Sequence, residues 1–162
     1  MVNLKNKTYV AILFLISLVV LLTAYTIQYL FGYQPCKLCL IERIPYVLSL
    51  IILILNYRFK NNQIFFSVLL SLVFIFSLLI SIYHFGIEQG FITESNVCGY
   101  NEKGSLITKE AVLKSLKEVT VNCKDVAFKV FGLSLTTYNI IISLIMFLIS
   151  AKIYLINNEN KK

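Results

Sequence analysis

The sequence lacks the common motifs for binding a nucleotide or a haem. Its six glycines form no G-x-G-x-x-G pattern, so no dinucleotide-binding fold is indicated. Leu40 follows the pair Cys36 and Cys39, so the haem-attachment motif C-x-x-C-H is absent as well. If this chain carries out redox chemistry, its electron acceptor must be bound in some other way.

Charge and metal ligands are also scarce. The net charge is +7, but no basic face remains once the apolar runs are set aside, so we expect no nucleic-acid partner. A structural zinc site needs four ligands, often from two closely spaced cysteine pairs. Here the second pair, Cys98 and Cys123, is widely spaced, and His84 is the one histidine. We therefore expect no metal.

Apolar residues are abundant instead, at 58% of the chain against about 45–50% in soluble domains. They gather in four runs with little charge, at residues 9–31, 44–57, 64–85 and 130–151. A spanning helix needs about 20 residues, and the second run reaches that length if its helix starts near Pro35. We expect an all-α membrane protein with a single membrane domain, residues 1–162. It would be a four-transmembrane-helix bundle with helices at about 9–31, 36–57, 64–85 and 130–152.

Basic residues on the short flanks of these runs predict the orientation. They would share one face of the membrane: Lys5, Lys7, Arg58, Lys60, Lys152, Lys161 and Lys162. By the positive-inside rule, both termini are then cytoplasmic. The first run is longer than the apolar core of a signal peptide, so we expect it to be a retained helix. All four cysteines would face the outside, where disulfides persist.

The long external loop, at about residues 86–129, contains a segment with helical periodicity. Val112, Leu116 and Val119 recur at i, i+4 and i+7, and Thr108 suits an N-cap. We expect a short amphipathic helix lying on the membrane surface. A solvated helix within a small folded loop is the alternative.

The stretch PCKLCLIER, residues 35–43, carries two cysteines and three charges beside an apolar run. Pro35 suits the first position of a helix, which would place Cys36 and Cys39 on one face near its positive end. Thiols in such surroundings have a lowered pKa. Arg43 would share this stripe and stabilise a thiolate or a bound anion. Glu42 would lie to one side, as a partner for Lys37 or for lipid headgroups.

The two cysteine pairs differ in what a disulfide would do. A bond between Cys36 and Cys39 closes a very small ring and constrains little chain entropy, so thiol exchange is its expected use. Cys98 and Cys123 enclose a longer loop, which a structural disulfide would also fit. With a reactive pair on the same face, we interpret the two pairs as a relay through mixed disulfides. A lipid-soluble quinone beside the first pair is the natural acceptor.

The motifs resemble a known family. PCKLCLIERIPY is similar to the C-x-x-C-x-x-E-R segment of the bacterial disulfide-bond-formation protein B (DsbB) family, and YHFGIEQGF, VCGY and NCKDVAFKVFGLSLTTYN resemble its second loop and last helix. The resemblance implies a multi-pass protein of the bacterial inner membrane. Such a protein reoxidises a periplasmic DsbA-type thiol oxidant and passes the electrons to ubiquinone or menaquinone, which supports disulfide formation in exported proteins.

The resemblance also implies roles for individual residues. Cys98 and Cys123 match the loop pair that receives electrons, with Cys98 the cysteine attacked by the thiol oxidant. Cys36 and Cys39 match the pair that passes electrons to the quinone, with Cys39 closest to its ring. Arg43 matches the arginine that supports quinone reduction.

Other interpretations remain open. A four-helix bundle with cysteine pairs also fits a quinone or thiol reductase of the vitamin-K-epoxide-reductase type, with electrons flowing in reverse. A non-enzymatic tetraspan scaffold with structural disulfides is a third. His84 and Glu88 would form a polar cap at the interface, with proton handling as the alternative. Tyr46 and Phe31 are candidates for lining a quinone pocket, although aromatic residues are common at membrane interfaces.

Overall fold

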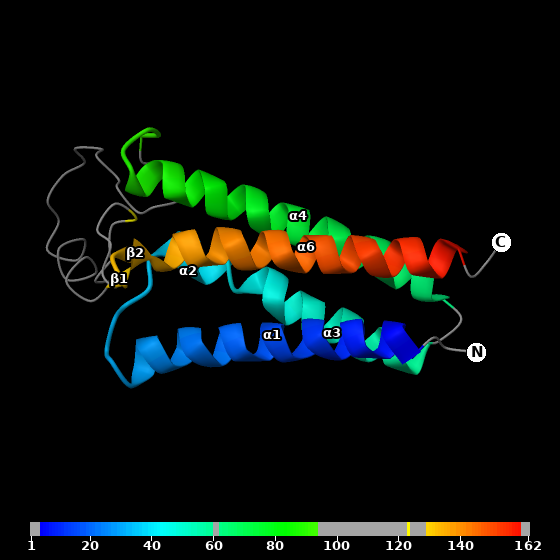
Figure 1. Cartoon of the computed structure of the whole chain (residues 1–162). Helices are drawn as coiled ribbons and strands as arrows, with labels where there is room; N and C mark the ends of the chain where they lie inside the picture. Colours follow the sequence, from blue (N-terminus) through cyan, green and yellow to red (C-terminus); the bar gives the residue numbers. More distant parts are fainter. Residues whose placement is uncertain (1–3, 60–61, 94–122, 124–128, 160–162) are drawn as a thin grey trace, which may run out of the picture.

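The computed structural model describes residues 4–59, 62–93, 123 and 129–159, and every structural statement here concerns these residues. Four segments are long and apolar enough to cross a membrane: Lys7–Tyr29, Lys37–Arg58, Gln63–Glu88 and Leu135–Glu159. They run side by side as a bundle, with both ends of the chain at the same end of it (Figure 1). The predicted all-α class with four membrane-spanning helices is confirmed.

Three of the spans are unbroken helices: α1 (Leu4–Tyr29), α4 (Gln63–Glu88) and α6 (Leu135–Glu159). None of them contains proline, because both prolines of the chain, Pro35 and Pro45, lie at the start of the second span. Proline removes a backbone donor and clashes with the carbonyl of residue i−4 inside a helix. The break in helical structure is therefore confined to the end of the bundle where the two prolines lie.

The second span is accordingly divided. A short helix α2 (Lys37–Ile41) is followed by a turn at Glu42 and Arg43, and then by α3 (Ile44–Arg58), with Pro45 in its first turn. Cys36 is the N-cap of α2, so Pro35 precedes the cap instead of occupying the first helical position. The expectation of one continuous helical stripe carrying Cys36, Cys39 and Arg43 is therefore wrong.

A two-stranded antiparallel hairpin precedes α6. Strand β1 (Lys129–Val130) pairs with β2 (Leu133–Ser134). Phe131 and Gly132 form the connection, both with positive φ, as a tight two-residue hairpin turn requires. The Ser134 hydroxyl accepts a hydrogen bond from the backbone N–H of Thr137 at 3.3 Å, which caps the new helix. This helix therefore starts at Leu135, and not near residue 130 as expected.

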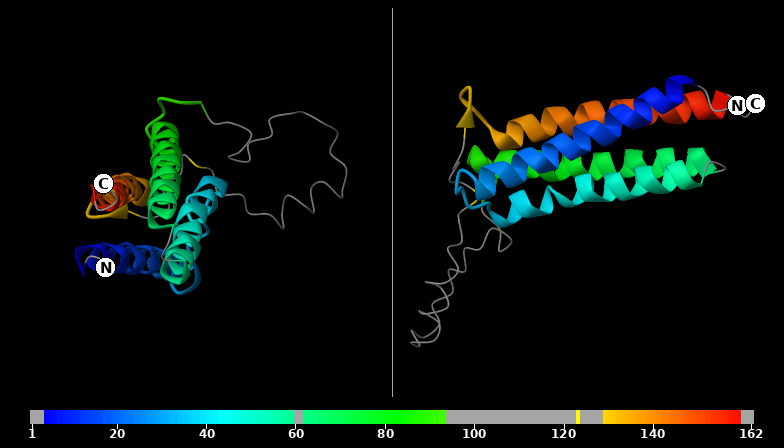
Figure 2. Two further views of the ribbon diagram at one scale, coloured as in Figure 1. Left: turned by 90° about the vertical axis from the view of Figure 1, so that its right-hand side faces the viewer. Right: turned by 90° about the horizontal axis from the view of Figure 1, so that it is seen from below.

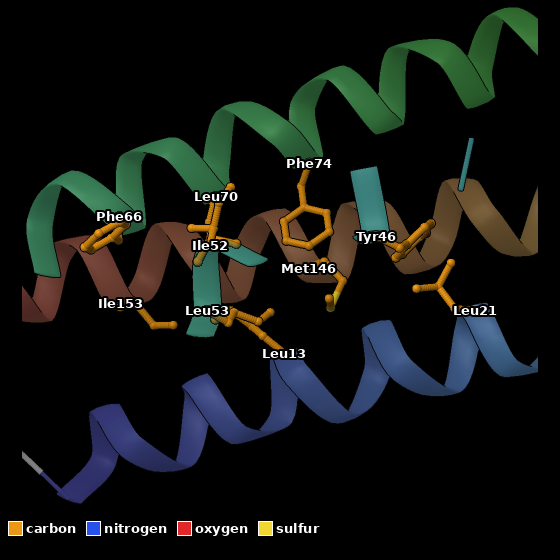
Figure 3. Close-up of a cluster of buried hydrophobic side chains, with 10 residues drawn as sticks. All are labelled: Leu13, Leu21, Tyr46, Ile52, Leu53, Phe66, Leu70, Phe74, Met146 and Ile153. Carbon is orange, nitrogen blue, oxygen red and sulfur yellow. The ribbon is translucent and has the colours of Figure 1, made fainter. Parts of the chain in front are cut away.

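The bundle core is filled by one cluster of large apolar side chains from all four spans (Figure 3). Its buried members are Leu13, Leu21, Tyr46, Ile52, Leu53, Phe66, Leu70, Phe74, Met146 and Ile153. Helix α4 packs along α6, while α3 packs against α1 and α4. Figure 2 shows the same bundle along its axis and from below.

Serine hydroxyls join the helices within this core. Ser17 on α1 bonds Ser49 on α3 at 2.8 Å, and Ser77 on α4 bonds Ser143 on α6 at 2.9 Å. Apolar lipid tails give little hydrophobic drive for helix association, so small residues and interhelical hydrogen bonds carry more of it. These contacts fix the helices that position the site described below.

Part of the sequence-based prediction lies outside the described residues. The amphipathic helix expected within the external loop, with Val112, Leu116 and Val119, belongs to this part. Cys98 does too, whereas Cys123 is described.

Ser143 tests the interhelical bonds. Its hydroxyl contacts Ser77 at 2.9 Å and the Tyr46 hydroxyl at 3.2 Å. We expect Ser143→Ala to lower the free energy of unfolding by about 0.6 kcal/mol per lost bond, and at most by about 1.7 kcal/mol. Thr23→Val is the control, because the Thr23 hydroxyl donates within its own helix, to the Val19 carbonyl. Unfolding in mixed detergent micelles measures both variants. An equal loss in the two would contradict the assigned role.

Candidate functional site

A buried histidine lies at the centre of a polar cluster at the end of the bundle away from the termini. His84, near the end of α4, is 1% exposed. Its Nδ1 lies 3.0 Å from Glu42 Oε1, and its Nε2 lies 3.5 Å from Cys36 Sγ. Because a carboxylate can only accept, Nδ1 donates to Glu42. Nε2 is then free to accept the Cys36 thiol proton or, once protonated, to donate to the thiolate.

A second carboxylate lies on the other side of the same ring. Glu88, one helical turn after His84, has Oε1 4.0 Å from His84 Nε2. The same oxygen accepts a hydrogen bond from the Thr136 hydroxyl on α6 at 2.6 Å. Its other oxygen, Oε2, is buried and has no hydrogen-bond partner among the described residues. The site therefore contains one carboxylate oxygen whose bonding capacity is unused.

The cysteines of the C-x-x-C motif are free thiols in close contact. Their sulfur atoms are 2.7 Å apart, about 0.7 Å more than a disulfide bond. Cys36 Sγ also accepts a hydrogen bond from the Cys39 backbone N–H at 3.2 Å. A small side-chain rotation would close the pair, so the local fold suits reversible disulfide formation.

The surroundings of Cys36 favour its thiolate. The hydrogen bond from the Cys39 thiol lowers the pKa of Cys36 most strongly, while burial raises it and the contact with His84 lowers it again. The net result is a pKa of about 5, against an ordinary value of 9.0. Above this pH the thiolate predominates, and the thiolate is the nucleophile in disulfide exchange. Of the two cysteines for which a lowered pKa was predicted, Cys36 has one, and its cause is side-chain contacts instead of a long helix.

The second cysteine pair is represented by Cys123, which is 2% exposed and disulfide-bonded. It belongs to one buried cluster with Cys36, Leu38 and Ile87, against which Cys39 packs. The fold thus places a loop cysteine next to the C-x-x-C pair, although the two lie far apart in the sequence. This is the proximity that a relay between the two pairs needs.

Arg43 contributes to a different face of the same segment. Its Nη1 donates to Gln28 Oε1 on α1 at 2.5 Å, and its guanidinium lies 5.1 Å from the centre of the Tyr25 ring. These side chains line a pocket of about 410 Å³ together with others from α1, α2 and α3. The lining residues are Tyr25, Gln28, Tyr29, Leu40, Arg43, Ile44, Val47 and Leu48. The turn at Glu42 and Arg43 thus directs one side chain to α4 and the next to α1.

The structure corrects several expectations about neighbouring residues. Glu42 is 8% exposed and pairs with His84, and not with Lys37 or lipid headgroups. His84 is a buried neighbour of Cys36, and not an interfacial cap. Tyr46 is buried in the core, where it donates to Asn139, so it does not line the pocket. Phe31 is 63% exposed and does not line it either.

The one signal that could have indicated this site in the sequence is the spacing of His84 and Glu88, which lie four residues apart near the end of an apolar run. Ionisable residues beside a membrane core are costly and are usually functional. The pairing of His84 with Glu42 and Cys36 depends on how α4 packs against the second span, which no local pattern reveals.

A membrane bundle with a C-x-x-C pair, a neighbouring loop disulfide and a thiolate-stabilising histidine defines a membrane thiol–disulfide protein. The family model described as disulfide bond formation protein DsbB matches residues 6–153. The chain belongs to the DsbB family, and this membership makes it a membrane oxidoreductase of disulfide formation. The family is generally linked to quinones.

One curated relative has a similar length. It is the uncharacterized protein RP370 of Rickettsia prowazekii (strain Madrid E), which is 26% identical over 162 residues. The match covers 97% of this chain and 92% of the relative. No solved structure matches the chain.

The pKa of Cys36 can be measured by the ultraviolet absorbance of its thiolate. In a Cys98→Ser/Cys123→Ser background, which leaves the first pair as the only thiols, we expect a titration step near pH 5. The thiolate is present above this pH and lost below it. His84→Gln should move the midpoint upward by about one pH unit or more, the worth of a hydrogen bond to a charged group.

Cys36→Ser is the control, because it should remove the step and so assign it. A midpoint near the ordinary value of 9.0, unaffected by His84→Gln, would contradict the assigned environment of Cys36.

Proposed function

We propose that this protein is a membrane thiol:quinone oxidoreductase. It would reoxidise a periplasmic DsbA-like thiol oxidant and pass the electrons through its two cysteine pairs to a membrane quinone. The observation that carries the proposal is the buried cluster in which the disulfide-bonded Cys123 lies with the free thiol of Cys36. Exchange between two disulfides requires this kind of proximity, because one sulfur must attack another directly.

In the first half of the reaction, the dithiol of the oxidant reduces the Cys98–Cys123 disulfide and becomes a disulfide itself. A thiolate of the loop pair then attacks the Cys36–Cys39 disulfide. This second exchange restores the loop disulfide and leaves Cys36 and Cys39 as thiols. Each exchange transfers two electrons and two protons. After both exchanges, Cys36 and Cys39 hold the two electrons and two protons that the DsbA-like oxidant gave up.

The pocket beside Arg43 fits a quinone headgroup. Its volume of about 410 Å³ lies within the usual range for small-molecule sites, about 300–1,000 Å³. The stacked rings of Tyr25 and Tyr29 offer flat aromatic surfaces, while Arg43 and Gln28 supply polar groups for a carbonyl. A quinone bound there would accept the two electrons and two protons of the reduced cysteine pair. Leu40, next to Cys39 in α2, lines this pocket and connects it to the sulfur site.

The protein's own residues would manage the protons of the pair. His84 Nε2, 3.5 Å from Cys36 Sγ, is placed to take the thiol proton, and Glu42 holds the ring in that orientation. The Cys36 thiolate would then bond to the Cys39 sulfur 2.7 Å away as the two electrons of the pair and its two protons, one of them by way of His84, pass to the quinone. In this assignment His84 and Glu42 position and deprotonate, while the two sulfurs undergo the redox change.

We also propose the orientation in the inner membrane. The site lies at the end of the bundle opposite to the start of α1 and the end of α6 (Figure 1). Arg58 ends α3, and Lys152 lies over the Tyr9 ring near the start of α1, at the end that holds the termini. Basic residues favour the cytoplasmic side, which would expose the cysteines to the periplasm.

The function is tested by turnover of the purified full chain. Mixed anaerobically with a reduced DsbA-like protein and a water-soluble ubiquinone or menaquinone analogue, it should convert quinone to quinol catalytically. Cys36→Ser and Cys39→Ser should each reduce the rate to the uncatalysed background, while Thr23→Val should not change it. Full turnover by both cysteine variants would eliminate the proposal. Faster net electron flow from quinol to an oxidised partner would favour a reductase instead.

Arg43 should act on quinone use and not on the cysteines. Arg43→Ala removes a charged donor from the pocket, so we expect the apparent KM for quinone to rise about tenfold or more. Arg43→Lys keeps the charge but loses the planar guanidinium, so its apparent KM for quinone should lie between those of the wild type and Arg43→Ala. Arg58→Ala, at the other end of the bundle, is the matched control. An unchanged KM in Arg43→Ala would remove this residue from the site.

A further inference from the structure

Three groups that bind soft metal ions meet at the sulfur site. Cys36 Sγ, Cys39 Sγ and a ring nitrogen of His84 all lie within 4.8 Å of one another. Two of them come from the C-x-x-C motif and the third from α4. Thiolate and imidazole are the ligands that zinc and related d¹⁰ cations prefer. The expectation of no metal site weighed the cysteine spacings and the single histidine, but the sequence did not show that α4 brings His84 next to the C-x-x-C pair.

The sulfur–nitrogen distance matches that of a tetrahedral site, whereas the two sulfurs lie closer together than such a site allows. With Zn–S near 2.3 Å and Zn–N near 2.0–2.1 Å, a sulfur and a nitrogen ligand are separated by roughly 3.6 Å. Cys36 Sγ and His84 Nε2 are 3.5 Å apart. Two sulfur ligands need roughly 3.8 Å by the same geometry, so the thiols must open by about 1 Å from their 2.7 Å contact. Side-chain rotation is enough for that change.

Glu88 is the candidate for a fourth ligand. Its carboxylate lies beside His84 but is not among the three groups that already lie within 4.8 Å of one another, so its side chain would have to turn toward the sulfurs. Its Oε1 is 4.0 Å from His84 Nε2, where a tetrahedral site would place a nitrogen and an oxygen roughly 3.4 Å apart. The Glu88 side chain is only 6% exposed, and its Oε2 has no hydrogen-bond partner among the described residues. Oε1 already accepts from Thr136, whereas Oε2 would gain a partner if the carboxylate turned to a cation, which would offset the cost of burying it.

Glu42 supplies the outer support that such a site needs. Histidine ligands usually donate their second ring N–H to a carboxylate, which fixes the ring and its tautomer. Glu42 Oε1 occupies that position at 3.0 Å from His84 Nδ1. Nε2, the nitrogen that faces the sulfur of Cys36, is therefore the one available to a metal.

We propose that the reduced protein binds one tetrahedral d¹⁰ cation, with Zn²⁺ as the type, through Cys36, Cys39, His84 and Glu88. Binding displaces the remaining thiol protons, and formation of the Cys36–Cys39 disulfide removes both sulfur ligands and abolishes the site. The metal-bound pair cannot close, so the cation would act as an inhibitor. Binding is independent of the proposed oxidoreductase function, whereas inhibition rests on it.

The test is a metal titration of the full chain in detergent, without oxygen, quinone or thiol partner. Reduced protein should take one Zn²⁺ per chain from a chromophoric chelator. With Cd²⁺ it should develop an ultraviolet charge-transfer band from thiolate to metal. Protein oxidised with diamide should do neither. No uptake by reduced wild type, or equal uptake after oxidation, would overturn the proposal whatever any variant does.

Variants then locate the metal. Cys98→Ser/Cys123→Ser should bind as wild type does, and loss of binding there would place the metal at the loop pair and overturn the assignment. Glu42→Ala should weaken binding about 10–100-fold through the loss of outer support. His84→Ala and Glu88→Gln should weaken it about tenfold or more. Glu159→Gln, at the other end of the bundle, is the matched control. Equal affinity in His84→Ala and wild type would also refute the site. Because no quinone is present, failure here leaves the turnover test unaffected.

Discussion

The contact of His84 with Glu42 on one side and Cys36 on the other is the interaction on which the site depends. All three side chains are buried at the end of an apolar bundle, where unpaired polar groups are costly. Each partner therefore limits the positions of the others. Helix α4 must hold His84 against the second span, and the second span must present Cys36 and Glu42 toward α4. The environment of the Cys36 thiol and the packing of α4 against the second span therefore depend on each other.

The break between α2 and α3 gives this arrangement two sides. Glu42 and Arg43 are adjacent in sequence, yet the turn sends Glu42 to His84 on α4 and Arg43 to Gln28 on α1. In the proposed mechanism, protons would be handled on the α4 side and the acceptor would bind in the pocket on the α1 side. The sulfur pair, at the start of α2, stands beside both.

Apolar run length predicted three of the four spans directly, because lipid demands about 20 apolar residues for each. The second span followed when its helix was extended back to Pro35. The C-x-x-C spacing predicted the close pair of Cys36 and Cys39, and the E-R step placed Arg43 near it. The contacts of His84 with Glu42 and Cys36 were not predicted, since they join helices remote in sequence. The break at Glu42 and Arg43 was missed because the short apolar run 44–57 needed a helix that began near Pro35 to reach the length of a span. Tyr46 was misjudged because an aromatic residue can serve equally in a core or in a pocket.

The most direct measurement is a single turnover without any protein partner. The Cys98→Ser/Cys123→Ser variant, in which no loop thiol can take over the new disulfide, is reduced, freed of reductant and mixed anaerobically with one equivalent of quinone. Quinol and the Cys36–Cys39 disulfide are then quantified together. Thiol-to-quinone electron transfer predicts equal amounts of both products, with Cys36 and Cys39 as the cysteines that become bonded. Quinone that stays oxidised beside a fully reduced, folded pair would contradict the account.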